Sequence, residues 1–388
     1  MKLLAAVLSV SPILCAQTTW IVDAGGGPGA QFADLPSAVA AAADGDTIVV
    51  REGPFGEGAT PFVTDKGLTI VGEGGFVPIG GNGSNRYRIE NLPAGSVFRM
   101  VGFSRPTDGA LWFDVQNCQG AVHFESLRCR ENIFFITLPS FDIVDCQSVT
   151  MREVETFGAP AVRIANSTVS LVRCRLGLTY IGLGGGPAIG AADSDVRVVQ
   201  PRFDTGFGEP AAITLDASSL TIGGDGASYI RNDPRFSTGG HLIDVQNGGV
   251  VQFDPDVGYA WQAGSSFVNG AAVLIGARQP CSWTSGAVVA GQPVTIQSLV
   301  PPAAFVFQAI GAPLALTPTP SGTLGVDPLQ SFAFFPGAAT PPTGAWSGSV
   351  TMPLSMPLGA VFATQAVYLT TTGVPQLGLG EPAILMVR

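Results

Sequence analysis

The chain has few of the side chains that carry acid–base and nucleophilic chemistry. Its 388 residues include only two lysines, Lys2 and Lys66, and two histidines, His123 and His241. Charged residues make up 12% of the sequence, and the formal net charge is −10. A chain so poor in basic residues has no electrostatic footprint for nucleic acid or for an anionic membrane surface. An acidic polymer would also be repelled on average, unless a local group of arginines or a bound cation intervened.

Cysteine is scarce, and long apolar runs are missing after the first residues of the chain. Five cysteines follow residue 16, at positions 118, 129, 146, 174 and 281. This small, odd number is not that of a disulfide-built scaffold, and no CxxC or HxH spacing indicates a metal site. No later run is long enough to span a bilayer, so the sequence predicts no transmembrane segment.

The first sixteen residues have the pattern of a secretory signal peptide. Lys2 supplies the positive start, residues 3–10 supply the apolar core, and Leu14-Cys15-Ala16 supplies a cleavage site before Gln17. Cys15 allows a lipoprotein alternative, although Leu14 is larger than the residue that usually precedes a lipidated cysteine. We therefore expect a secreted or cell-surface protein.

A short phrase recurs along the first two thirds of this glycine-rich chain. It is written FDVQNC at 113–118 and FDIVDC 28 residues later at 141–146, with weaker copies at 162–167 and 243–248. Each copy alternates apolar and polar residues and then reaches Asn or Asp, as a short strand stopped by a tight turn does. A second short strand follows the stop, at 122–124, 149–151 and 169–171. Because one copy cannot bury its apolar face alone, the repeat predicts coils stacked along an axis.

Stacking the copies places polar side chains in rows on the outside of the coils. The second position of the phrase is Asp114, then Asp142, then Arg163, and in the later copies Thr214 and Asp244. Neighbouring rungs lie about 4.8 Å apart, so the two carboxylates would disfavour each other's ionisation unless a cation or Arg163 compensated. Clustered carboxylates can bind Ca²⁺, and an arginine can hold an acidic sugar. The alternative is a solvated row of ion pairs without a binding role.

Two further pairs follow from the same stacking. Glu125 and Arg152 fall on one outward row, where we expect a structural ion pair across coils. Cys118 and Cys146 occupy the same place in adjacent copies, within the range of Cα separations that a disulfide accepts. Two buried thiols and a disulfide are both open alternatives there.

The N-terminal part of the chain predicts a strand at 18–23, a glycine-rich loop at 24–29 and a short helix within 32–43 that Asp34 caps. The phrase GDTIVVREGPF follows at residues 45–55. This order resembles the first coil of secreted proteins of the pectin-lyase-like superfamily. The resemblance covers roughly residues 17–275. It implies a right-handed parallel β-helix whose N-terminal helix caps the open end of the stack.

The resemblance also implies which residues to test for activity. Lyases of that superfamily hold Ca²⁺ on acidic residues of the parallel sheet and use an arginine or lysine to abstract a proton beside the uronate carboxylate. It therefore marks Asp114 and Asp142 as candidate Ca²⁺ ligands and Arg163 as a candidate catalytic residue. No lyase motif surrounds them, and the Asn-x-Asp, Asp-Asp, Gly-His-Gly and Arg-Ile-Lys signatures of the superfamily's hydrolases are absent.

Four more arginines lie where the second strand of a coil ends. They form the candidate substrate-binding group, because a guanidinium group binds anionic sugars well. The alternative is that they only cover the corner of a coil. These residues are Arg128, Arg130, Arg173 and Arg175.

The composition changes near residue 276, after which arginine almost disappears. Short strands at 293–297, 304–308, 348–352, 366–369 and 383–387, separated by Pro-rich turns such as 316–320, predict a small antiparallel β-sandwich. The all-β chain thus divides into a signal peptide (1–16), a right-handed parallel β-helix (17–275), a linker (276–287) and a C-terminal β-sandwich (288–388). A sandwich so poor in charge is suited to capping, attachment or sorting.

These observations favour a secreted or cell-surface β-helix protein without catalytic activity, which binds carbohydrate or serves as a structural spacer. The expected partner is a polysaccharide or a cell-surface glycan, and we expect a monomer that binds no nucleic acid. The alternative is a carbohydrate-active enzyme, with a Ca²⁺-dependent lyase acting on uronates as its leading form. The scarcity of histidine and lysine and the missing motifs favour the first interpretation.

Overall fold

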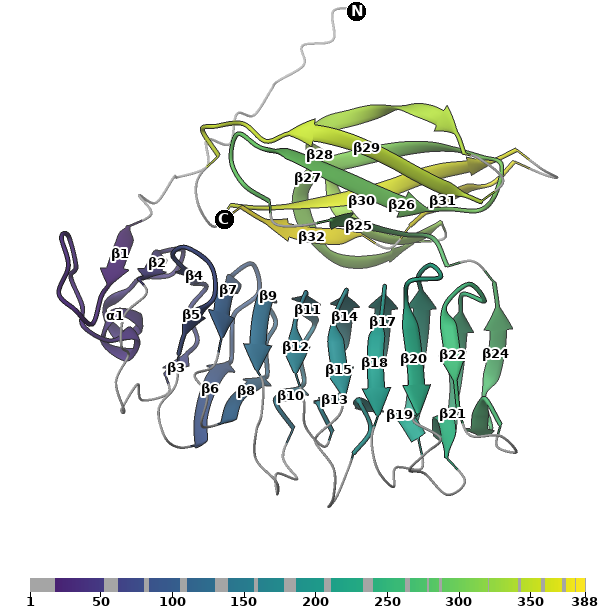
Figure 1. Cartoon of the computed structure of the whole chain (residues 1–388), viewed down its shortest axis with the longest axis horizontal. Helices are drawn as coiled ribbons and strands as arrows, with labels where there is room; N and C mark the ends of the chain where they lie inside the picture. The colour runs from purple at the N-terminus through teal and green to yellow at the C-terminus, as the bar shows by residue number, and fades with distance from the viewer. Residues whose placement is uncertain are drawn as a thin grey trace, which may run out of the picture.

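The computed structural model describes residues 18–51, 62–79, 84–104, 110–129, 139–156, 160–177, 186–205, 211–232, 240–261, 266–277, 279–285, 288–319, 321–340, 343–356, 360–371, 375–380 and 382–387. Within these ranges the chain is almost entirely β-structure, with a single short helix, α1 (Leu35–Ala41). A 24-stranded parallel system, the coil stack, is joined by two antiparallel sheets (Figure 1). The predicted signal peptide and Arg130 lie outside the described residues. No helix in the described ranges is long and apolar enough to cross a membrane.

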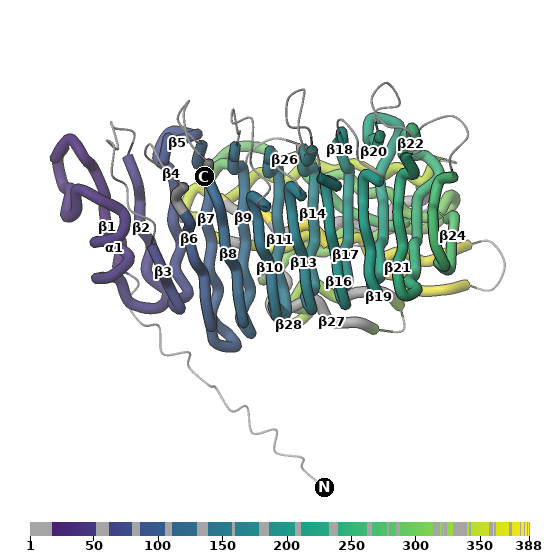
Figure 2. The backbone as a smooth tube through the Cα atoms, turned by 90° about the horizontal axis from the view of Figure 1, so that it is seen from below, coloured from purple at the N-terminus to yellow at the C-terminus, as the bar shows by residue number. Residues whose placement is uncertain are grey.

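The coil stack is built from short strands that pair in parallel with strands one coil away, as β10 does with β8 and β13. Figure 2 shows the coils following one another from the purple N-terminal end to the green end. The strands are β1 (Thr19–Val22), β2 (Thr47–Val50), β3 (Val63–Thr64), β4 (Thr69–Gly72), β5 (Val77–Pro78), β6 (Ser84–Glu90), β7 (Val97–Ser104), β8 (Ala110–Gln116), β9 (Ala121–Cys129), β10 (Phe141–Val144), β11 (Ser148–Arg152), β12 (Glu155–Thr156), β13 (Val162–Ala165), β14 (Thr168–Val172), β15 (Arg175–Gly177), β16 (Ile189–Ala192), β17 (Asp195–Val199), β18 (Arg202–Thr205), β19 (Ala211–Gly223), β20 (Tyr229–Asn232), β21 (His241–Phe253), β22 (Gly258–Ala260), β23 (Val268–Gly270) and β24 (Val273–Gly276).

A left-handed residue ends the first strand of a coil and turns the chain into the second strand. Asn117, Asp145 and Asn166 hold this place with φ angles of 54°, 55° and 46°. Asn and Asp tolerate this conformation better than other residues that carry a β-carbon, which explains why the repeated phrase ends on them. The predicted order of strand, stop and second strand is confirmed, because β8, β10 and β13 precede these turns and β9, β11 and β14 follow them.

The aromatic residues of the phrase stack inside the coils. The rings of Phe113 and Phe141 lie 4.8 Å apart between centroids with their planes at 11°, and Tyr87 lies 5.5 Å from Phe113 on the other side. Val162 continues this buried row on the next coil. A slip of one residue would turn the polar positions of the phrase inward, so burial of this row fixes the register of the coils.

Cys118 and Cys146 are buried free thiols at the corner that follows the turn residue. Their Sγ atoms donate to the carbonyl oxygens of Gln116 at 3.3 Å and Val144 at 3.2 Å. The hydrogen bond with Cys118, together with burial, raises the pKa of the Cys146 thiol, which keeps it protonated. Of the two alternatives for this pair, the structure therefore contains the thiols. Serine takes the same place in the next three coils, at Ser167, Ser194 and Ser218.

The predicted N-terminal capping helix is confirmed. Asp34 accepts a hydrogen bond from the backbone N–H of Ser37 at 2.8 Å and so caps the start of α1. At the other end, the ammonium group of Lys66 donates to carbonyl oxygens that the end of a helix leaves without partners. These belong to Val39, Ala40 and Ala42, at 3.0, 3.0 and 2.7 Å. One of the two lysines of the chain is thus used to hold the cap on the stack.

Two antiparallel sheets with a shared core follow the coil stack, and we call them the C-terminal sheet pair. One sheet contains β25 (Cys281–Ser285), β26 (Pro293–Leu299) and β29 (Ala345–Thr351). The other contains β27 (Ala304–Thr319), β28 (Gly322–Ala339), β30 (Val361–Thr370), β31 (Leu377–Leu379) and β32 (Ala383–Met386). Val294 and Ile296 of the first sheet pack with Ile310, Phe362 and Leu385 of the second. The all-β fold class, a parallel β-helix followed by small antiparallel sheets, is confirmed.

One local prediction for this part is wrong in its bounds. The predicted turn at 316–320 begins too early, because β27 continues to Thr319, which pairs with Gly322 of β28, with shifts of register between Gly311 and Pro313 and between Pro313 and Thr317. Irregular pairing removes the need for a ladder N–H at every position, so a strand can carry prolines there. The segment interpreted as a linker, residues 276–287, contains β25, which pairs with β26 from Cys281 to Ser285.

The C-terminal sheet pair packs along one side of the coil stack (Figure 1). The contact is apolar where second strands of the coils meet β25 and β26. Val172 of β14 and Val199 of β17 are buried there in one cluster with Cys281, Trp283 and Leu299. This docking removes an outward face of the coil stack from water.

The expected ion pair between Glu125 and Arg152 is confirmed and lies beside this contact. Arg152 donates from Nη1 to Glu125 Oε1 at 2.6 Å and from Nη2 to the hydroxyl of Thr284 in β25, also at 2.6 Å. The Arg152 side chain is only 1% exposed. A charge so deeply buried requires such partners, because desolvation penalises it strongly.

Replacing Phe141 by alanine should lower the free energy of unfolding by about 3–5 kcal/mol, because it leaves a cavity between Phe113 and Val162. Val63→Ala is the matched control, since the Val63 side chain is 58% exposed in β3. It should change stability by less than about 0.5 kcal/mol. Denaturant unfolding followed by circular dichroism measures both variants. Equal, small effects would contradict a stabilising role for the stacked rings.

Candidate functional site

The three residues of the predicted carboxylate–arginine row lie on one row in the structure. Strands β8, β10 and β13 pair with Asp114 opposite Asp142 and with Asp142 opposite Arg163. The row then continues through Gly190, Thr214 and Asp244. Between Asp114 and Asp244 the sequence alignment therefore placed the rungs correctly and omitted only the glycine.

The two carboxylates marked as candidate Ca²⁺ ligands, Asp114 and Asp142, are already paired with arginine. Asp142 accepts two hydrogen bonds from the guanidinium of Arg163, one of them from Nε at 2.7 Å, and this raises the pKa of Arg163. Asp114 accepts a hydrogen bond from Arg86 at 2.9 Å and lies 3.6 Å from Arg88. Asp114 and Asp142 are 3% and 7% exposed. Two buried carboxylates thus meet three guanidinium groups, which compensate their mutual repulsion.

This geometry bears on the chemistry expected of the row. A calcium ion bound by Asp114 and Asp142 would have to displace their guanidinium partners. In the part of the chain that the structure describes, no group of three or more His, Cys, Asp and Glu side chains is arranged to hold a metal ion. A general base must also lose its proton, and the contact with Asp142 makes this harder for Arg163. The metal and catalytic roles stay predictions, and the geometry favours an ion-paired row.

The corner arginines do not share one partner. The guanidinium of Arg128 lies 3.7 Å from the ring centroid of Phe76, as in a cation–π contact. Arg173 lies 3.5 Å from Glu153 and donates to the carbonyl of Thr284, and Arg175 lies 3.2 Å from Glu155. Burial lowers the pKa of Arg173, while Glu153 acts against this. Since Arg130 is not described, anionic sugar binding by these four residues stays a prediction.

A groove of 760 Å³ runs along the corner between the first and second strands, and we call it the corner groove. The left-handed turn residues Asp145, Asn166 and Asp193 line it with exposed side chains. Gln147 and Thr168, where the second strands begin, add further hydrogen-bonding side chains to its lining. The lining comes from five successive coils, and no described lining residue is an arginine or lysine. The corner groove is therefore an open, hydrogen-bonding and acidic surface.

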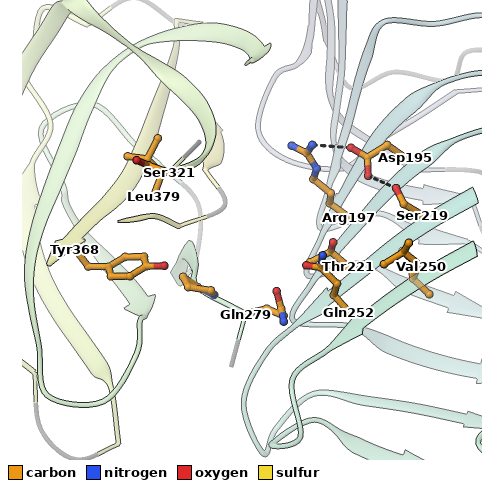
Figure 3. Close-up of a pocket in the computed structure, with 12 residues that line it drawn as sticks. Asp195, Arg197, Ser219, Thr221, Val250, Gln252, Gln279, Ser321, Tyr368 and Leu379 are labelled. Atoms are coloured by element: carbon orange, nitrogen blue, oxygen red, sulfur yellow. Dashed lines mark hydrogen bonds and ion pairs between the residues drawn. The ribbon is translucent and has the colours of Figure 1, made fainter. Parts of the chain in front are cut away.

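A second cavity, the cleft, has a volume of 370 Å³ and lies between the coil stack and the C-terminal sheet pair (Figure 3). The coil stack contributes Arg197, Thr221 and Gln252 to one wall. From the opposite wall the side chain of Tyr368 points toward the coil stack (Figure 3). Burial raises the pKa of Tyr368, so its phenol stays protonated and can donate a hydrogen bond.

The corner groove and the cleft meet at Asp195 and Ser219, which line both. Asp195 accepts hydrogen bonds from Arg197 at 2.6 Å and from the hydroxyl of Ser219 at 2.7 Å (Figure 3). The carboxylate is therefore held in place by neighbours on its own sheet. A ligand lying in the corner groove would reach the cleft at this residue.

Arg197 and Thr221 belong to a polar row on the second strands, which we call the second-strand row. Its members are in register from coil to coil, and most are buried although they point away from the core of the coils. The row consists of Thr69, Arg99, His123, Thr150, Ser170, Arg197 and Thr221. In this row His123 lies opposite Thr150, and Thr150 lies opposite Ser170. The burial of the row could not be predicted, because part of it arises from the docking of another part of the chain.

Comparison with known proteins does not extend these observations. The chain matches no protein-family model, and a search of curated proteins finds no match either. The parallel β-helix is established by the strand pairing itself. Membership of the pectin-lyase-like superfamily stays an expectation from the sequence, and function has to be argued from the geometry of the site.

Glu125→Gln and Asp142→Asn form a matched pair that tests which ion pair supports the fold. Glu125→Gln should cost about 3 kcal/mol of unfolding free energy, because it deprives the buried Arg152 of its nearest carboxylate. Asp142→Asn should cost less than about 1 kcal/mol, because the side chain of Arg163 is 56% exposed and water replaces the carboxylate. Urea unfolding of both variants measures the difference. Equal losses of unfolding free energy in the two variants would contradict the idea that the buried ion pair supports the fold more than the exposed one.

His123 should make the protein less stable in mild acid. Burial, helped by the nearby charge of Arg99, lowers the pKa of His123 to about 3, against about 6.5 in an unfolded chain. The unfolded chain therefore binds a proton that the folded chain does not, and stability falls as the pH drops below about 6.5. The loss between pH 7 and pH 5 should be about 2 kcal/mol. Urea unfolding at both pH values should show this extra loss in the wild type and not in His123→Gln, and parallel profiles would contradict it.

Proposed function

We propose that the protein is a secreted or cell-surface β-helix protein, akin to the pectin-lyase-like proteins, that binds a neutral polysaccharide without cleaving it. The observation that carries this proposal is the corner groove, an open surface on which hydrogen-bonding side chains repeat from coil to coil. The cleft at its end supplies a second wall from the C-terminal sheet pair.

The shape of the corner groove supports a linear ligand. Five coils contribute to it, and at about 4.8 Å per coil the lining spans about 19 Å, enough for several sugar rings. Asn166, Gln147 and Thr168 each combine donor and acceptor atoms, as do the hydroxyl groups of a sugar. A glycan can therefore make the same contacts ring after ring, whereas a compact ligand would use only part of the surface.

The charge of the corner groove supports a neutral ligand over an acidic one. Asp145, Asp193 and Asp195 line it, and the whole chain carries a formal charge of −10. Carboxylates gathered in this way repel a uronate chain. A uronate would have to bind elsewhere, at Arg163 or the corner arginines, and the described members of that set already contact acidic or aromatic side chains.

The cleft supports a role for the C-terminal sheet pair in binding. Tyr368 offers a ring face and a phenol donor opposite Thr221 and Gln252. Aromatic faces pack well against sugar rings while their polar edges form hydrogen bonds. In this proposal the cleft holds one end of the glycan or a side branch. The attachment or sorting role expected of the sheet pair can coexist with this one.

Retention on immobilised polysaccharides tests the proposal. The purified mature chain should be retarded in native gels that contain neutral glycans such as xylan, galactan or β-glucan, and less so in gels with pectate or alginate. The double variant Gln147→Ala/Asn166→Gly should weaken binding about 3- to 10-fold, because it removes hydrogen bonds made to the ligand. Glycine is chosen at position 166 because it accepts the left-handed backbone, where φ is 46°.

Asn247→Gly is the matched control for the groove variant. Asn247 is also left-handed and donates to a carboxylate one coil away, Asp216, as Asn166 does to Asp145, but it does not line the corner groove. It should leave retention unchanged. Absence of retention on every glycan would overturn the binding proposal and favour a structural spacer. Ca²⁺-dependent release of unsaturated product from a uronate polymer, read by absorbance, would favour the lyase alternative instead.

A further inference from the structure

Arg99 is a partly buried cation with no carboxylate within 4.0 Å among the described residues. It lies outward on β7, with Thr69 and His123 as its neighbours in the second-strand row. Its Nη1 donates to the hydroxyl of Thr69 at 3.2 Å, and its Nε is buried without a hydrogen-bond partner. Burial lowers the pKa of Arg99 to about 10, which still leaves it charged at neutral pH.

Among the described arginines on the coils, Arg99 differs both from nine that are paired with a carboxylate and from Arg128 and Arg202, which are exposed. Nine described arginines lie within 4.0 Å of a carboxylate, whereas Arg99 has no such contact among the described residues. The nine are Arg51, Arg86, Arg88, Arg152, Arg163, Arg173, Arg175, Arg197 and Arg231. Leaving a buried charge uncompensated is costly, so the exception needs an explanation.

The next rung of the row carries a second unsatisfied donor. His123 is 6% exposed, and its Nδ1 has no hydrogen-bond partner. Arg99 and His123 are direct partners in the register of β7 and β9, so they lie about one strand spacing apart. The neighbouring hydroxyls of Thr69 and Thr150 extend the polar surroundings on both sides.

We propose that Arg99 and His123 form a binding site for a small oxyanion: sulfate, phosphate or a carboxylate group. The Nε–H of Arg99 and the Nδ1–H of neutral His123 would each donate to an oxygen, and the anion would supply the charge that Arg99 lacks. Arg99 is partly exposed although its Nε is buried, so binding of a small ion requires the guanidinium group to turn toward it. Neither residue lines the corner groove or the cleft, so this site does not depend on glycan binding.

The scarcity of histidine makes the site directly observable. The chain has only His123 and His241, so His241→Gln leaves one ring signal in a proton NMR spectrum of the full chain with labelled histidine. Titration with sodium sulfate should shift this signal saturably, and sodium chloride at equal ionic strength should not. A parallel titration with sodium acetate tests whether a carboxylate is accepted as well as an inorganic oxyanion. Saturable binding of sulfate or of acetate supports the site. Which of the two binds tells whether the ligand is an inorganic oxyanion or a carboxylate group.

Arg99→Gln, in the same His241→Gln background, should weaken the binding of the anion at least about tenfold, because it removes a charged hydrogen bond. Arg231→Gln, at an exposed arginine paired with Asp204, is the control and should leave the titration unchanged. Sulfate also stabilises proteins generally, so a rise in melting temperature counts only where it exceeds that of Arg99→Gln. No saturable shift of the His123 signal with any of these anions, or the same shift in Arg99→Gln, would overturn the proposal.

Discussion

The structure depends on the in-register stacking of the coils. Each coil is too thin to bury its own apolar face, so Phe113 must lie over Phe141 and Phe141 over Val162. This single requirement turns every position of the repeated phrase into a row along the stack. The register set by the apolar row also fixes the neighbours of the polar positions. Each outward side chain of the phrase therefore lies beside the side chain at the same position of the next coil. The interactions of outward side chains in this protein are therefore mostly those between equivalent positions of neighbouring coils.

Stacking of equivalent positions brings acidic side chains of neighbouring coils together, and arginines compensate the repulsion between them. Asp142 pairs with Arg163 on the following coil, and Glu125 pairs with Arg152 in the same way. The same rule extends to Glu155 with Arg175 and to Asp204 with Arg231. Most of the basic residues that the structure describes are used for this compensation. To assign a catalytic role to one of these ion pairs, a feature is needed that distinguishes it from the other pairs.

The sequence was sufficient to predict the coils, the cap and the neighbours along a row. Asp114, Asp142 and Arg163 were placed on adjacent rungs because alternation and the Asn/Asp stop define the register locally. Arg86 and Arg88, which also hold Asp114, lie on a coil where the phrase is not recognisable, so they were missed. The cleft was missed for a different reason. Tyr368 and Thr221 are far apart in the chain, and only the docking of the C-terminal sheet pair brings them together.

The corner groove illustrates how a binding surface can arise from a requirement of the fold. The chain must turn sharply at residues such as Asp145, Asn166 and Asp193, and the left-handed backbone there favours Asn and Asp. Because those side chains are exposed, the turn residues form a polar groove whether or not a ligand is present. Under the proposed function, the groove alone would therefore give affinity for many glycans and selectivity for few. Selectivity has to come from the part that the repeat does not dictate, namely the cleft at Asp195, where Tyr368 faces the coils.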